Sequence, residues 1–173
     1  MRCSPIILGL ISCANNGASS SPSNQFQACS EGPSPSIEVG HGELRFETFD
    51  QAEHTPVELI HGPQGGYHST IAVRAAHLDP DRSYIIDLVG VIDGLELGGG
   101  TPLAQFRCNY AADAQEFKGG LLIWDAVPDE LHDKRAQVSV YVIDPSKETS
   151  DGQSVIVAQD TAEYTIWDPE LEN

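Results

Sequence analysis

The sequence predicts an all-β fold, in the form of an immunoglobulin-like antiparallel β-sandwich of about eight to ten strands. Two observations support this prediction. Short apolar runs recur between clusters of turn-forming residues, and no run of about ten residues carries the apolar stripe of an amphipathic helix. The Cys-Trp-Cys spacing of antibody domains is missing, because Cys29 precedes the first expected strand. The prediction therefore concerns the sandwich architecture and not the antibody family.

The expected domain covers residues 36–167 and is followed by an acidic C-terminal tail at 168–173. Pro-, Gly- and Asp-rich segments at 78–82, 96–101 and 145–153 are expected to be loops. One helical turn is expected within 125–135, where Pro128 limits its length. Strands are expected at 37–39, 44–47, 57–60, 67–76, 83–92, 103–108, 121–124, 138–142, 154–158 and 163–166.

The most distinctive stretch is 61–74, in which a turn leads into a strongly patterned strand. Pro63 fixes its own φ, and glycines permit positive φ, so this segment is expected to reverse the chain. The predicted turn residues are Gly62, Gln64, Gly65 and Gly66. Beyond the turn, a period of two places Tyr67, Ile71, Val73 and Ala75 on the core face. The opposite face then carries His68, Thr70, Ala72 and Arg74.

Charge excludes one class of function. Nine basic and 26 acidic side chains give the 173 residues a formal net charge of −17. Phosphates would be repelled, so the sequence argues against binding a nucleic acid or an anionic membrane through charge. A solvated, exported surface explains such acidity, and a calcium site or a basic partner is the alternative.

The N-terminus predicts export and lipid anchoring. Residues 1–12 combine one early positive charge with an apolar core that is too short to span a bilayer, as in a signal peptide. The sequence Leu10-Ile11-Ser12-Cys13 resembles the bacterial lipobox, which implies that Cys13 is lipidated and becomes the first mature residue. Ala14 favours the outer membrane or cell surface, and an ordinary cleaved signal peptide is the alternative. Residues 13–35 then form the anchor and a flexible, Ser-rich linker.

Two cysteines remain once the signal peptide is removed and Cys13 is lipidated. They are Cys29 and Cys108, and an oxidising compartment favours a disulfide between them. Two buried free thiols are the alternative. A bond across this long loop would stabilise the domain by roughly 4–5 kcal/mol in the chain-entropy model.

The search for chemistry is mostly negative. The chain lacks a nucleophile elbow, a zinc-protease helix motif, a phosphate loop and a dinucleotide fingerprint, so we expect no enzyme activity and no cofactor. His61 and His68 flank one turn and are the candidate ligands for copper or zinc. Loop aspartates at 79–81 and 144–151 do not match a calcium loop. Aromatic residues for a carbohydrate platform are Trp124, Trp167 and Tyr110, although tryptophans in β proteins usually lie in the core or at its rim.

The pattern Gly62-x-Gln64-Gly65-Gly66-x-His68, with the lipobox and the Ser-rich linker, resembles uncharacterised bacterial lipoproteins that carry one sandwich-type domain. The resemblance implies a cell-envelope lipoprotein whose domain has a non-catalytic binding or structural role. A lipid anchor would make the membrane its partner, whereas a protein or small-molecule partner is not identified. The alternatives are a periplasmic metal-binding domain and an envelope hydrolase with dispersed catalytic residues.

Overall fold

Twelve strands make one continuous, mostly antiparallel sheet in the computed structural model, which describes residues 27–30, 32–50, 52 and 54–172. The hydrogen-bonded order is β2-β1-β5-β10-β7-β6-β11-β12-β3, with β4, β8 and β9 attached to β5, β6 and β10. The elements are η1 (Gln27–Cys29), β1 (Ser36–His41), β2 (Glu47–Thr48), β3 (Pro56–Glu58), β4 (Ile60–His61), β5 (Tyr67–Ala76), β6 (Tyr84–Ile92), β7 (Leu95–Gly100), β8 (Leu103–Ala104), β9 (Arg107–Asn109), β10 (Ala114–Trp124), α1 (Pro128–Leu131), β11 (Arg135–Glu148) and β12 (Ser154–Trp167).

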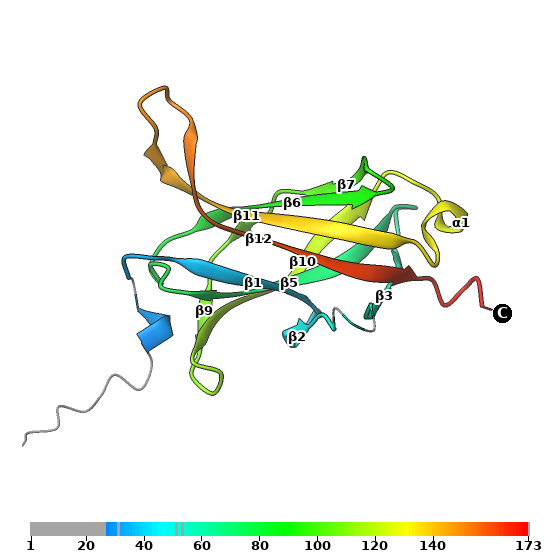
Figure 1. Cartoon of the computed structure of the whole chain (residues 1–173), viewed down its shortest axis with the longest axis horizontal. Helices are drawn as coiled ribbons and strands as arrows, with labels where there is room; N and C mark the ends of the chain where they lie inside the picture. Colours follow the sequence, from blue (N-terminus) through cyan, green and yellow to red (C-terminus); the bar gives the residue numbers. More distant parts are fainter. Residues whose placement is uncertain (1–26, 31, 51, 53, 173) are drawn as a thin grey trace, which may run out of the picture.

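The sheet folds back on itself around one core. Figure 1 shows β6, β7 and β11 on one side of the molecule and β1, β5 and β9 on the other. Strand β10 joins the two sides, because it pairs with β5 along most of its length and with β7 at Ile123 and Trp124. The segment 56–61 joins them again, since β3 pairs with β12 and β4 pairs with β5. The predicted all-β fold is therefore confirmed, with the layers hydrogen-bonded to each other at both of these joins.

Alternating burial builds the core as the sequence predicts. In β5, Ser69, Ile71, Val73 and Ala75 are buried, but Ala72, which is expected on the opposite face, is completely buried as well. Strand β6 alternates between buried and half-buried along its whole length. The inward residues of β11 are completely buried: Ala136, Val138, Val140 and Val142. The helical turn forms where it is expected, with Pro128 in its first turn, where the missing N–H has no partner to lose.

The prediction of a loop at 96–101 is wrong, because Leu95–Gly100 forms strand β7. The glycines make room for the indole of Trp124, which is 3% exposed and donates from Nε1 to Ser69 Oγ at 3.1 Å. A Cβ at Gly98 would lie 2.7 Å from that ring, and a Cβ at Gly90 in β6 would lie 2.8 Å from it. A side chain at either position would displace the indole.

Strands also extend beyond their predicted ends. Strand β11 continues to Glu148 inside the expected loop 145–153, because a register shift between Asp144 and Glu148 accommodates the intervening residues. The β11–β12 hairpin consequently projects from the body of the sheet (Figure 1). Within the described ranges, no helix is long and apolar enough to cross a membrane.

Two neighbouring glycines of β7 allow a direct test of the Trp124 packing. Gly98→Ala should lower the free energy of unfolding by about 1–3 kcal/mol, because the new methyl group overpacks the indole. Gly99→Ala is the matched control, since its Cβ would meet only Leu88 O at 3.7 Å, and it should change stability by less than about 1 kcal/mol. Urea unfolding of the full-length variants measures both, and equal losses would contradict the packing argument.

Candidate functional site

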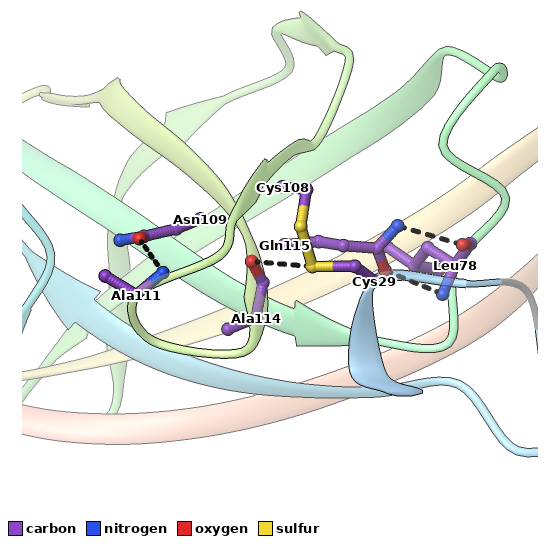
Figure 2. The surroundings of a disulfide bond; sticks show 7 residues. All are labelled: Cys29, Leu78, Cys108, Asn109, Ala111, Ala114 and Gln115. Carbon is purple, nitrogen blue, oxygen red and sulfur yellow. Dashed lines mark hydrogen bonds between the residues drawn. A yellow bond between two sulfur atoms is a disulfide. The ribbon is translucent and has the colours of Figure 1, made fainter. Parts of the chain in front are cut away.

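The predicted disulfide between Cys29 and Cys108 is present and is confirmed, with the two Cα atoms 5.5 Å apart. It fastens η1, at the start of the described chain, to β9. The side chain of Gln115 lies beside it and pairs with the backbone of Leu78, accepting from N–H and donating to C=O at 2.9 Å each (Figure 2). The predicted lipidation residue Cys13 and the linker up to residue 26 lie outside the described residues.

The turn at 62–66 is a three-residue hairpin loop. Gly62 N–H donates to Gly66 C=O at 2.8 Å, and Gly65 N–H donates to Gly62 C=O at 3.0 Å, which leaves Pro63 and Gln64 at the tip. Gly65 has φ +84°, a conformation that favours glycine, whereas Gly66 has no positive φ. A Cβ at Gly66 would meet nothing within 4 Å, so this glycine is not required by its own surroundings.

The two candidate metal-binding histidines point to opposite faces of the hairpin. His61 is paired with Tyr67 and His68 with Ile60, so adjacent cross-strand pairs separate the two imidazoles. His61 Nε2 lies 2.9 Å from the buried carboxylate of Asp168, and its ring packs edge-on against Tyr67. Among the described residues, no group of three or more His, Cys, Asp or Glu side chains is placed to hold a metal ion. Metal binding by the pair His61 and His68 stays a prediction that this register does not favour.

Asp79, Asp144 and Trp124 have structural contacts. Asp79 and Asp144 both accept from Arg82, which ties the turn before β6 to the base of the projecting hairpin. Hydrogen bonds from Asp81 N–H and from Arg82 lower the pKa of Asp79. Trp124 is buried in the core, which removes it from the predicted carbohydrate platform, whereas Tyr110 is 64% exposed.

A cavity of about 600 Å³ lies beside the disulfide, along the paired strands β9 and β10. Strand β10 carries a bulge at this cavity. Phe117 is opposite Val73 and Gly120 is opposite Ile71, so the intervening Lys118 and Gly119 face a single residue of β5. The side chains that line the cavity include Gln105, Arg107, Asn109, Tyr110, Glu116 and Lys118. Volumes of this size are typical of small-molecule sites.

The charged wall of this cavity is anchored by Glu116, a buried carboxylate. Its Oε1 accepts from Arg74 Nη2 at 3.2 Å, and its Oε2 lies 3.4 Å from Lys118 Nζ. Burial alone would raise the pKa of Glu116, but hydrogen bonds from Asn109 and Arg74 and the charge of Lys118 hold the pKa below its usual value. Glu116 is therefore ionised at neutral pH, and both of its oxygens are occupied.

The sequence did not predict this cavity; it predicted only the disulfide at Cys108, which the structure shows beside it. Arg107 and Asn109 lie two residues apart, so in a strand they share one face. This polar face was the sequence feature that could have indicated the cavity. The sequence could not show which residues of β10 line the cavity, because the bulge at Lys118 and Gly119 interrupts the alternation of the two strand faces.

No family model and no curated protein matches the chain. Among solved structures, the chain is similar to a bacterial adhesin from Mobiluncus mulieris containing intramolecular disulfide, isopeptide and ester bond cross-links, in two crystal forms with TM-scores of 0.43 and 0.45. The sequences are 11% identical, and the similarity covers 77% of this chain and 57% of the adhesin chain. This chain thus spans little more than half of the adhesin chain it matches. A similarity at this level carries no information about function.

Substitutions in the turn should separate the two adjacent glycines. Gly65→Ala should lower the free energy of unfolding by about 1 kcal/mol or more, because alanine is strained at positive φ. Gly66→Ala should cost less than about 0.5 kcal/mol. Urea melts of the two variants compare them, and an equal or larger loss for Gly66→Ala would rule out the role assigned to Gly65.

The pH dependence of stability should change when Glu116 is neutralised. Because its pKa is lower in the folded chain than its ordinary value of 4.5, ionised Glu116 favours the folded state above that value. This contribution is lost as the pH falls through the lower, folded pKa. Wild-type protein should therefore lose more stability than Glu116→Gln on acidification from about pH 5 to about pH 3 in urea unfolding experiments.

The control for this experiment is Glu58→Gln, the same chemical change at an exposed residue of β3. It should keep the wild-type dependence on pH. Parallel profiles for wild type and Glu116→Gln would show that the ion pairs of Glu116 do not favour its charged form.

Proposed function

We propose that the chain is an exported, lipid-anchored binding domain of the bacterial cell envelope. The observation that carries the proposal is the disulfide between Cys29 and Cys108, because such bonds persist in oxidising, extracytoplasmic compartments. The lipobox-like sequence ending at Cys13 supports the lipid anchor, and Ala14 supports the outer membrane or cell surface as its location.

The position of the disulfide fits a tethered domain. Residues 13–35 would connect the lipid to the domain, and Cys29 lies inside this segment. The bond fixes the distal part of the tether to β9, next to the cavity. Tension on the tether is then transmitted directly to the sheet, and the cavity stays on the part of the domain that the anchor holds.

A non-catalytic role is supported by the groups that line the cavity. Its cysteine is committed to the disulfide, and its carboxylate is held in ion pairs with Arg74 and Lys118. The remaining polar groups are amides, a phenol and cations, which bind ligands through hydrogen bonds and charge. Such a lining suits the recognition of a small polar molecule.

Lipidation is tested by feeding labelled palmitate to bacteria that express the full-length chain. The label should enter the wild-type protein and should be absent from Cys13→Ala, because acylation requires that thiol. Cys3→Ala is the matched control and should remain labelled. Equal labelling of Cys13→Ala and wild type would refute the anchor.

A further inference from the structure

We propose that the cavity along strands β9 and β10 binds a saccharide that carries one carboxylate, with Arg107 as its main charged contact. The inference rests on the proposed binding function and names the chemical class of the ligand. It starts from the distribution of positive charge in an acidic chain.

Almost every cation in the described chain is neutralised by a neighbour. Of the nine basic side chains, Arg2 lies outside the described residues, and six others approach a carboxylate within 4.0 Å. The two described cations without such a partner are Arg45 and Arg107. Arg45 is exposed in the connection between β1 and β2, whereas Arg107 lines the cavity.

Arg107 forms no ion pair with the carboxylate of Glu116, which lies opposite it on the neighbouring strand. Glu116 is its direct cross-strand neighbour, but the Glu116 oxygens are engaged by Arg74 and Lys118. The guanidinium of Arg107 therefore keeps its planar set of donors for another acceptor. The planar N–H donors of a guanidinium match a carboxylate, which can accept two parallel hydrogen bonds from them.

The number of charges at the site favours a ligand with a single negative charge. The charged side chains that line the cavity are Arg107, Lys118 and Glu116, which leaves an excess of one positive charge. A doubly charged phosphate would bring a second negative charge close to Glu116. A polyanion would in addition be repelled by the net charge of −17.

The neutral groups of the cavity are suited to sugar hydroxyls. Gln105 donates from Nε2 to Pro80 C=O at 3.3 Å, which leaves its Oε1 as an acceptor. Asn109 has two amide hydrogens, of which the bond to Glu116 uses one. Tyr110, which is 64% exposed, lines the same cavity. Amide acceptors and donors beside a cation match a carboxylated sugar better than an apolar ligand.

The test is a titration of the full-length protein, purified in detergent, with glucuronate, followed by ligand-observed NMR. Glucose is the matched neutral sugar and should bind at least about tenfold more weakly, because it lacks the charge-assisted hydrogen bond. Arg107→Gln should weaken glucuronate binding by roughly tenfold or more for the same reason. Arg45→Gln removes the other unpaired cation and should leave the affinity unchanged.

Thermal melting of Arg107→Gln should match that of wild type, since the side chain is exposed, so a loss of affinity would not reflect unfolding. Equal glucuronate affinity for Arg107→Gln and wild type would overturn the inference. Equal or tighter binding of inorganic phosphate, or of a short peptide through its C-terminal carboxylate, would also overturn it, while leaving a binding function in place. Absence of palmitate label at Cys13 would instead count against the proposed envelope anchor and not against this site.

Discussion

The packing of Trp124 holds the two sides of the sheet together. Its indole donates to Ser69 in β5, while its ring covers Gly90 in β6 and Gly98 in β7. Strand β5 lies on one side of the folded-over sheet and β6 and β7 lie on the other, and β10 connects the two sides by pairing with β5 and with β7. A large aromatic ring can take this position only where the facing strands carry no side chain, so the glycines and the tryptophan depend on each other.

The parts of the fold that follow from local alternation could be predicted, and the parts that follow from long-range contacts could not. Strand β11 buries every second residue from Ala136 to Asp144, and β5 does so apart from Ala72, so a period of two in the sequence is enough to find them. The glycines of β7 show no alternation of apolar and polar side chains. Glycine is required at Gly98 because the ring of Trp124, in another strand, occupies the space of a side chain. His61 likewise shows no local sign of its partner Asp168, which is 107 residues away in the sequence.

The cavity illustrates the same limit at the level of function. Its walls come mainly from a hairpin that the disulfide fixes to η1, and a bulge in β10 changes which residues face it. The expected disulfide pointed to the neighbourhood of Cys108, and the residues beside it carry the polar lining. Which side chains meet there depends on the register shift, and a shift of one residue exchanges the two faces of a strand.

Scarcity of positive charge explains how the remaining cations are used. Two of the three buried carboxylates in the described chain, Glu116 and Asp144, each hold two cations, Arg74 with Lys118 and Arg82 with Lys147. Burial by itself would raise the pKa of each carboxyl group, but the surrounding donors lower both pKa values, so each stays charged at neutral pH. Structural demands thus engage four of the basic side chains at two points of the sheet. An arginine that lines a cavity without joining either cluster is therefore available for a ligand, because no structural contact in the described chain requires its charge.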